Sequence, residues 1–213
     1  MWSGIRKSYD AVARKYADEI YGELAGKPFD RDVLDRFADR VRGPGPVCDL
    51  GCGPAQIARY HRNRGVDAFG ADFSEGMLVE ARRLNPDLPF VQTSMLALGL
   101  RSETLAGVAA FYSIIHIPRS KVVEALAEVR RVLRPGGLLL FTFHLGSEDS
   151  HHDEFFGQTV NLDLALFSTA EMSGYLKAAD LVIEQVQERD PYRPEVEYQS
   201  RRAYIRAYKP KAA

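Results

Sequence analysis

Short apolar segments alternate with amphipathic segments of helical length along most of the chain, and this alternation constrains the fold more than any other feature. The segments with strand character are 47–50, 66–71, 89–92, 107–112, 138–144, 181–189 and 202–208. The segments with helical spacing or helical end signals are 8–21, 30–41, 54–64, 75–84, 119–133 and 168–179. This order predicts an α/β fold with a doubly wound, mostly parallel sheet.

Local signals predict where several of these elements begin and end. Asp30, Ser74 and Ser168 each precede a helical segment and are expected to cap it. Pro54 is expected to start the helix that follows the first strand. Residues 134–137, Arg-Pro-Gly-Gly, predict a tight turn into the strand at 138–144.

The composition is that of an ordinary globular protein rather than of a nucleic-acid-binding or membrane protein. The chain has 213 residues, which suits one domain, and 28 Lys and Arg balance 29 Asp and Glu. That balance argues against a nucleic-acid partner. The first residues lack the apolar core of a signal peptide, and no apolar run reaches membrane-spanning length, so we expect a cytoplasmic protein with no membrane partner.

The chain has only two cysteines, Cys48 in the first strand and Cys52 in the loop after it. We expect both to be reduced, because one close pair supports neither a disulfide framework nor a zinc site.

In a doubly wound sheet, ligands bind beyond the carboxyl ends of the strands, and a glycine turn lies there after the first strand. Gly51 and Gly53 let the backbone approach a ligand closely, and the helix behind them offers free N–H groups to an anion. A nicotinamide-binding loop shares these features. Gln56 occupies the position where such a loop has a third Gly or Ala, which disfavours that alternative.

Asp72 ends the second strand, about 20 residues after the glycines, which is the spacing of an acid that binds ribose hydroxyls. A carboxylate at this point can accept two hydrogen bonds from a vicinal diol. The structural alternative is that Asp72 merely precedes the helix cap at Ser74.

Three segments together resemble the motifs of class I S-adenosylmethionine-dependent methyltransferases. They are residues 47–54 (VCDLGCGP), 72–78 (DFSEGML) and 130–138 (RRVLRPGGL), in the order and spacing of that family. The resemblance extends over residues 8–144 and is nearest to the small-molecule branch that includes the ubiquinone-biosynthesis type. It implies a Rossmann-like sheet of seven strands with a partly antiparallel last hairpin, and S-adenosylmethionine as cofactor.

The resemblance also implies roles for individual residues. Asp49 would hold the amino group of the cofactor, and Gly51 and Gly53 would line its methionine portion. Asp72 would bind the ribose, and Ser94 stands where relatives often place an acid against the adenine. The full cofactor set comprises Tyr16, Asp49, Gly51, Cys52, Gly53, Asp72, Phe73, Met77, Ser94, Met95 and Tyr112.

The segment after the fourth strand would face the transferring methyl group. His116 is the candidate general base, because an imidazole titrates near neutral pH, and a structural histidine is the alternative. The candidate substrate contacts are Ile115, His144, Phe155 and Phe156. Residues 151–154 could suggest a metal, but adjacent loop residues rarely complete a coordination shell, and no metal is predicted.

The sequence divides into a helical lid at 1–45, a cofactor-binding core at 46–145, and a substrate-side loop, helix and closing strands at 146–213. Basic and aromatic residues alternate over 198–209, which a strand with Ala203, Ile205 and Ala207 facing the core explains more simply than nucleic-acid binding.

These observations predict methyl transfer to an oxygen or nitrogen of a small-molecule acceptor. A nicotinamide oxidoreductase and a non-catalytic S-adenosylmethionine-binding protein are the alternatives. The sequence does not predict the acceptor or the oligomeric state. A nucleic-acid methyltransferase is disfavoured, because residues 112–115 replace the target-base motif that such an enzyme carries.

Overall fold

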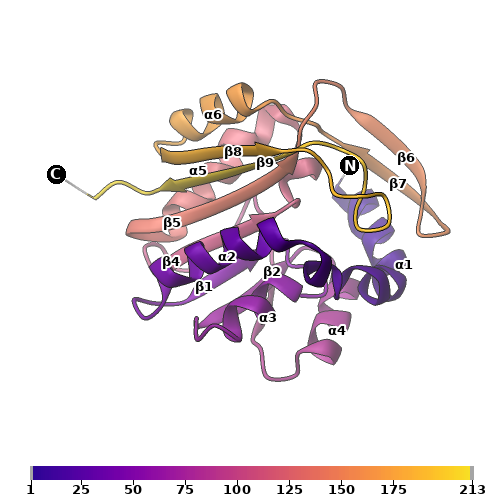
Figure 1. Ribbon diagram of the computed structural model, residues 1–213, viewed down its shortest axis with the longest axis horizontal. Coiled ribbons are helices and arrows are strands. Elements are labelled where there is room, and N and C mark those ends of the chain that lie inside the picture. Colours follow the sequence, from indigo (N-terminus) through magenta and orange to yellow (C-terminus); the bar gives the residue numbers. More distant parts are fainter. Residues whose placement is uncertain (1, 212–213) are drawn as a thin grey trace.

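The computed structural model describes residues 2–211, and a seven-stranded sheet runs through its centre in the order β3-β2-β1-β4-β5-β9-β8 (Figure 1). Its strands are β1 (Val47–Leu50), β2 (Ala68–Asp72), β3 (Phe90–Gln92), β4 (Leu105–Phe111), β5 (Leu133–His144), β8 (Val182–Arg189) and β9 (Arg202–Tyr208). Strands β1 to β5 are parallel, and β9 pairs antiparallel with both β5 and β8. The predicted fold class, with its antiparallel last hairpin, is confirmed.

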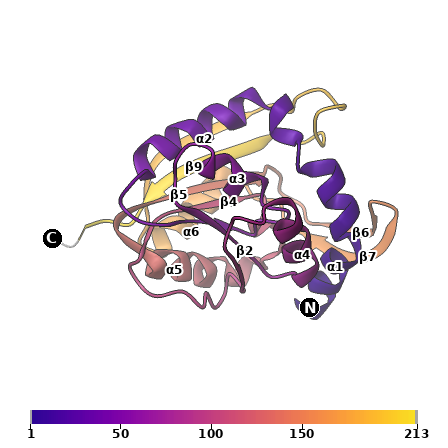
Figure 2. The ribbon, with the colours of Figure 1, turned by 90° about the horizontal axis from the view of Figure 1, so that it is seen from below.

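Helices cover both faces of this sheet, as Figure 2 shows with α2 and α3 on one side and α5 and α6 on the other. The helices are α1 (Trp2–Ile20), α2 (Pro28–Val41), α3 (Gln56–Arg62), α4 (Glu75–Leu84), α5 (Val122–Val132) and α6 (Thr169–Ala178). Three short 3-10 turns join them: η1 (Glu23–Gly26), η2 (Ile114–His116) and η3 (Arg119–Lys121). Phe37 of α2 packs in one apolar cluster, and Leu126 of α5 packs in another on the opposite face. Burial on both faces explains why the central strands are almost wholly apolar.

Two predicted helix caps are confirmed, and two predicted helix starts are wrong. The hydroxyl oxygens of Ser74 and Ser168 each accept a hydrogen bond of 3.1 Å from the third backbone N–H of their helices. Asp30 lies inside α2 rather than at its cap, because α2 already begins at Pro28. The Asp30 side chain is buried and contacts other side chains instead. Helix α3 begins at Gln56, not Pro54, because Ala55 is left-handed (φ 69°) and prolongs the glycine turn.

Residues 134–137 belong to β5, which runs from Leu133 to His144, but they bulge out of its pairing with β4. The register moves from Leu105↔Leu133 to Gly107↔Leu138, so the segment makes a local turn inside the strand rather than a connection before it. Gly136 has a positive φ of 77°, its N–H donates to the carbonyl of Lys209 at 2.8 Å, and the N–H of Lys209 donates to the carbonyl of Gly137 at 3.0 Å.

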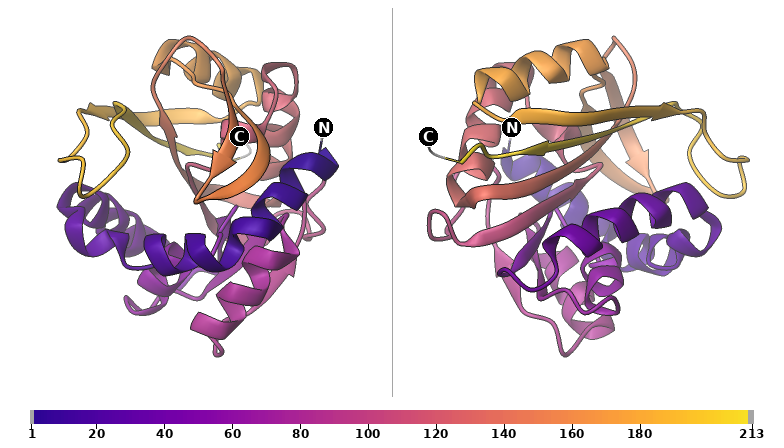
Figure 3. Two further views of the ribbon diagram at one scale, coloured as in Figure 1. Left: turned by 90° about the vertical axis from the view of Figure 1, so that its right-hand side faces the viewer. Right: turned by 60° about the vertical axis from the view of Figure 1, so that its left-hand side comes forward.

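A hairpin replaces the loop predicted after β5, so that prediction is wrong. Strands β6 (Ser150–Phe155) and β7 (Gln158–Leu164) pair antiparallel, and Phe156 and Gly157, both with positive φ, make the two-residue turn. The hairpin lies against α1, as both views of Figure 3 and the left panel in particular show. Val160 and Leu162 on one face of β7 pack in a cluster with α1, which is the burial that holds the hairpin in place.

Strand β9 follows the predicted alternation, but its second face is not solvated. Ala203, Ile205 and Ala207 are fully buried, as expected. Arg202 and Tyr204 are also buried, each 2% exposed, because helices cover both sides of the sheet at this strand. Within residues 2–211, no helix is long and apolar enough to cross a membrane.

Candidate functional site

A pocket of about 820 Å³, partly open to solvent, lies at the carboxyl ends of β1, β2 and β4 and beneath α1. It is lined by Ile5, Arg6, Tyr9, Tyr16, Leu50, Gly51, Gly53, Asp72, Phe73, Ser74, Met77, Thr93, Ser94, Met95, Phe111, Tyr112, Ser113, His116 and Ile117. Ten of the residues predicted from the sequence are in this lining: Tyr16, Gly51, Gly53, Asp72, Phe73, Met77, Ser94, Met95, Tyr112 and His116.

The glycine turn after β1 lines this pocket and is closely packed against the residues around it. Gly51 has a φ of 72°, and a methyl group built on it would lie 2.3 Å from Cβ of Ser113. Ser113, which sequence reasoning missed, donates from its hydroxyl to the carbonyl of Leu50 at 2.7 Å. The ends of β1 and β4 are thereby held together at a separation that leaves no room for a side chain at Gly51.

Asp72 reaches into the pocket from the end of β2, and backbone groups hold its carboxylate. The N–H of Gly53 donates to Oδ2 and the N–H of Ser74 donates to Oδ1, each at 2.8 Å. Burial raises the pKa of the Asp72 carboxyl in spite of these bonds, and the negative charge of Asp10 adds to the effect. Each oxygen keeps acceptor capacity for a further donor, such as a hydroxyl in the pocket.

Asp10 on α1 is a second residue that the sequence did not indicate. Its Oδ1 accepts hydrogen bonds from the hydroxyl of Ser74 at 2.6 Å and from the N–H of Gly76 at 2.8 Å. Asp10 therefore fastens α1 to the start of α4, directly beside Asp72. A single exposed aspartate on an amphipathic helix carries no pattern that would have revealed this.

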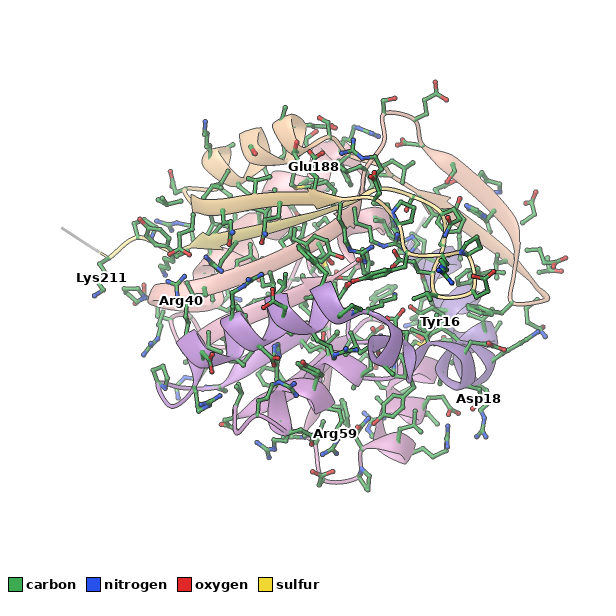
Figure 4. All side chains as sticks on the ribbon, viewed as in Figure 1. Tyr16, Asp18, Arg40, Arg59, Glu188 and Lys211 are labelled. Carbon is green, nitrogen blue, oxygen red and sulfur yellow. The ribbon has the colours of Figure 1, made fainter. Side chains whose placement is uncertain are left out.

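Two tyrosines of α1 line the pocket, and they differ in their hydrogen bonding. The ring of Tyr16 packs edge-on against Phe156 and tilted against Phe155, and burial raises the pKa of its phenol. No group of residues 2–211 makes a hydrogen bond with the Tyr16 hydroxyl, although that hydroxyl belongs to a pocket-lining side chain. Figure 4 shows Tyr16 at the end of the molecule near α1 and the hairpin, far from Arg40 and Lys211.

The Tyr9 hydroxyl, by contrast, lies 2.6 Å from Nε2 of His116. Nδ1 of His116 lies 3.1 Å from the backbone carbonyl oxygen of Asp163 on β7, and a carbonyl can only accept. Nδ1 therefore carries the proton, and Nε2 is the bare nitrogen that accepts from Tyr9. Burial lowers the pKa of His116 to about 4, so the imidazole is neutral at physiological pH.

Six predicted site residues are not in the pocket lining. They are Asp49, Cys52, Ile115, His144, Phe155 and Phe156. Asp49 lies below the glycine turn, where Oδ2 accepts from the N–H of Ala58 at 2.9 Å, and burial raises the pKa of its carboxyl to about 7. Cys52 and Ile115 are buried under the loops that carry them. Phe155 and Phe156 pack against the outward side of the α1 tyrosines, so they brace the lining without belonging to it.

The hydroxyl of Tyr112 and the ring of His144 belong to a buried polar network beside the pocket. Tyr112 has a left-handed backbone (φ 53°), and its hydroxyl lies 3.1 Å from that of Tyr204. His144 stacks on Tyr112 with ring centroids 4.8 Å apart, and burial, together with the charge of Arg202, lowers its pKa to about 4. Arg189 and Asp30 complete the network with an ion pair of 2.8 Å. Tyr112 thus lines the pocket with its ring while its hydroxyl is engaged elsewhere.

The acidic and histidine-rich segment 151–154 forms strand β6 rather than an open loop. His151 lies 2.7 Å from a carboxylate oxygen of Asp163 and 3.0 Å from one of Asp153, on the solvent side of the hairpin. Among the residues that the structure describes, no group of three or more His, Cys, Asp or Glu side chains is placed to hold a metal ion.

Residues 47–137, which carry β1 to β4, α3 to α5 and the glycine turn, match the family model described as "Methyltransferase domain". The chain is 31% identical over 136 residues to a malonyl-[acyl-carrier protein] O-methyltransferase of Enterobacter lignolyticus. The aligned residues cover 64% of this chain and 47% of that protein. The chain is 32% identical over 135 residues to a demethylmenaquinone methyltransferase of Beutenbergia cavernae, with 62% and 54% covered. The chain therefore spans about half the length of the curated relatives that it matches.

A solved structure of a DhpI–SAH complex superposes with a TM-score of 0.75 at 18% identity, covering 99% of this chain and 98% of that one. At that identity the similarity supports the fold alone. The predicted family, fold class and cofactor are confirmed by the family model, the relatives and the fold together. Residues 47–137 are therefore identified as a methyltransferase domain.

Proposed function

We propose that this protein transfers the methyl group of S-adenosylmethionine to an oxygen or nitrogen of a small-molecule acceptor. The observation that carries the proposal is the Asp72 carboxylate, which reaches into the pocket and is held there by the N–H of Gly53. An acid at this point of the sheet suits a vicinal diol, and the glycine turn beside it leaves the backbone open to a bound molecule.

The residues present fit this cofactor. Asp72 offers acceptor capacity to ribose hydroxyls, and Phe73, Met77 and Met95 give apolar walls for a purine. The Tyr16 hydroxyl, which has no hydrogen-bond partner within residues 2–211, is placed to donate to the carboxylate of a methionine moiety. When bound, S-adenosylmethionine supplies a methyl group on a sulfonium, which is already a good electrophile.

The remaining pocket residues then have the task of positioning the acceptor. Holding a nucleophile in line with the methyl carbon supplies much of the rate enhancement in such a reaction. Ile5, Tyr9, His116 and Ile117 form this part of the lining, which suits an acceptor with an apolar body and one polar group.

The relatives differ in what they methylate, since one is named for an acyl-carrier protein and the other for demethylmenaquinone. A free small-molecule acceptor, with neither nucleic acid nor membrane as partner, is our choice for this chain. The near balance of charges and the apolar pocket support it. A cytoplasmic location and one domain spanning 1–213 stay predictions from the sequence.

The test is a calorimetric titration of the purified protein with S-adenosylhomocysteine, with NAD titrated in parallel. We expect micromolar or tighter binding of S-adenosylhomocysteine and no binding of NAD. Binding of NAD alone would replace the proposal with an oxidoreductase. If S-adenosylhomocysteine binds but radiolabelled S-adenosylmethionine methylates no compound in a broad acceptor screen, the protein is a non-catalytic binder.

A further inference from the structure

His116 connects three elements that are far apart in the sequence. Its ring is carried by η2, its Nε2 accepts from Tyr9 on α1 at 2.6 Å, and its Nδ1 donates to the carbonyl of Asp163 on β7 at 3.1 Å. The hairpin itself is fixed on α1, where the hydroxyl of Ser8 accepts from the N–H of Asn161 at 2.9 Å. The tautomer of His116 is therefore set by a backbone carbonyl of this hairpin.

Both partners of this hydrogen bond face the pocket. Tyr9 and His116 line it together with Ile5 and Ile117, whose side chains provide apolar surface. The Tyr9 oxygen gives its proton to His116 and keeps acceptor lone pairs for a donor that enters the pocket. A hydroxyl of an acceptor that donates to Tyr9 would continue a chain of hydrogen bonds, all running toward the bare Nε2.

The other titratable groups of the lining are poorly placed to take a proton from a molecule bound beside Tyr9. Asp72 is the one carboxylate in the lining, and its remaining acceptor capacity is assigned above to the ribose hydroxyls of the cofactor. A methyl acceptor with a protonated amine would need a carboxylate partner near Tyr9, and the described lining has none besides Asp72. Arg6, an exposed residue of the lining, is the group that a carboxylate acceptor would use instead.

We propose that Tyr9 and His116 act together as the proton acceptor, and that the methyl acceptor is a hydroxyl compound such as a phenol or an enol. The proposal rests on the function proposed above and names its substrate class. As the oxygen–carbon bond to the methyl group forms and the carbon–sulfur bond breaks, the hydroxyl proton passes to the Tyr9 oxygen. The proton of Tyr9 passes at the same time to Nε2 of His116. The resulting imidazolium keeps its Nδ1 proton on the carbonyl of Asp163 and later loses one proton to water.

In this arrangement Tyr9 touches the acceptor and is the catalytic residue, and His116 acts through Tyr9. A neutral imidazole suits the task, because a hydroxyl becomes strongly acidic only while it is being methylated and a weak base then suffices. A carboxylate acceptor would bring no proton at neutral pH and would leave the pair without a role.

The experiment uses two probes with one apolar frame, 2-naphthol and 2-naphthoate, titrated into the protein saturated with S-adenosylhomocysteine. We expect 2-naphthol to bind more tightly than 2-naphthoate, and Tyr9→Phe to weaken 2-naphthol binding about tenfold by loss of one hydrogen bond. Tyr21→Phe is the matched control, because the Tyr21 hydroxyl donates to Asn85 at 2.7 Å and Tyr21 is not in the pocket lining. It should leave 2-naphthol binding unchanged.

A second variant separates a proton-transfer role from a structural one. His116→Gln keeps an oxygen that can accept from Tyr9 but cannot take up a proton at neutral pH. We expect this variant to bind 2-naphthol as the wild type does, and to lose methyl transfer from S-adenosylmethionine to 2-naphthol by about 100-fold or more.

Tighter binding of 2-naphthoate, no binding of 2-naphthol, or equal 2-naphthol binding by wild type and Tyr9→Phe overturns the proposal. Undiminished transfer by His116→Gln also overturns it. Binding of S-adenosylhomocysteine, measured first, keeps these outcomes distinct from a failure of the proposed function itself.

Discussion

The backbone N–H of Gly53 donates a hydrogen bond of 2.8 Å to Oδ2 of Asp72, so the glycine turn and the acid at the end of β2 hold one another in place. The turn orients the carboxylate, and the carboxylate in turn satisfies an N–H that the tight backbone leaves free. Residues 19 positions apart in the chain thus behave as one unit of the site.

Replacing Asp72 should therefore remove most of the affinity for S-adenosylhomocysteine. Asp72→Ala deletes a charge-assisted acceptor in a partly buried site, a loss of roughly 2–4 kcal/mol in binding free energy. Calorimetric titration measures it, with Asp87→Ala as control, since Asp87 is an exposed carboxylate that pairs with Arg59 outside the pocket. A dissociation constant for Asp72→Ala equal to that of the wild type would exclude Asp72 from the cofactor site.

Gly51→Ala should destabilise the whole fold. The added methyl group would lie 2.3 Å from Cβ of Ser113 on a backbone with a φ of 72°, so either the strand ends separate or the turn distorts. We expect a loss of about 2–4 kcal/mol in the free energy of unfolding, measured by urea denaturation. Gly99→Ala is the control, because nothing lies within 4 Å of the added atom there. An equal effect of the two substitutions would contradict the packing argument.

Tyr16→Phe should weaken the binding of S-adenosylhomocysteine about tenfold, the effect of one hydrogen bond to a charged group. The thermal midpoint of unfolding should stay at the wild-type value, because the Tyr16 hydroxyl bonds to nothing within residues 2–211 and the ring is retained. Tyr60→Phe, which removes a hydroxyl bonded to Asp35 outside the pocket, should not change the affinity. Unaltered affinity in Tyr16→Phe would limit Tyr16 to packing.

His61 should make the fold sensitive to acid. It is fully buried, neither ring nitrogen has a hydrogen-bond partner among the described residues, and burial lowers its pKa to about 3. The unfolded chain takes up a proton near pH 6.5, whereas the folded protein does not until near pH 3, so the free energy of unfolding falls as the pH drops between these values. The loss attributable to His61 at pH 5 is about 2 kcal/mol.

The variant that tests this is His61→Leu, compared with wild type by urea denaturation at pH 7.5 and pH 5. Relative to wild type, His61→Leu should gain stability on going to pH 5. A difference between the two proteins that does not change with pH would mean that His61 takes up a proton in the folded protein as readily as in the unfolded chain.

Arg189→Met should lower the free energy of unfolding by disrupting the buried polar network beside the pocket. The guanidinium of Arg189 pairs with Asp30 at 2.8 Å and with Glu197 at 2.5 Å, and both carboxylates are almost wholly buried. Glu197 would keep its pairs with Arg202 at 3.0 Å and Lys27 at 3.6 Å, whereas Asp30 would lose its ion pair. An uncompensated buried charge of this kind costs about 3–5 kcal/mol in the free energy of unfolding. Arg201→Met, which breaks an exposed pair with Glu188, should cost about 1 kcal/mol or less. Comparable melting temperatures for the two variants would show that the buried pairs contribute little.

Local patterns along the chain predicted the elements of the sheet well. The range of α4 and its cap at Ser74 follow from a helical repeat with a side-chain acceptor at its start, and both need only neighbouring residues. The segment 134–137 shows the limit of such patterns. Its glycine pair predicts a turn, and the chain does bulge there, but only the pairing with Lys209 at the far end of the chain makes that bulge part of a strand.

The sequence alone determined the side of the pocket that we propose holds the cofactor, because that side is built from two short motifs at the ends of neighbouring strands, and parallel strands bring such ends to one edge. Gly51, Gly53 and Asp72 line the pocket there. The tertiary structure decided the side that we propose binds the acceptor, where Tyr9, His116 and the carbonyl of Asp163 meet from three separate elements. Their meeting depends on how α1 and the hairpin pack over the sheet. That packing depends on burial summed over many side chains, and no local pattern encodes it.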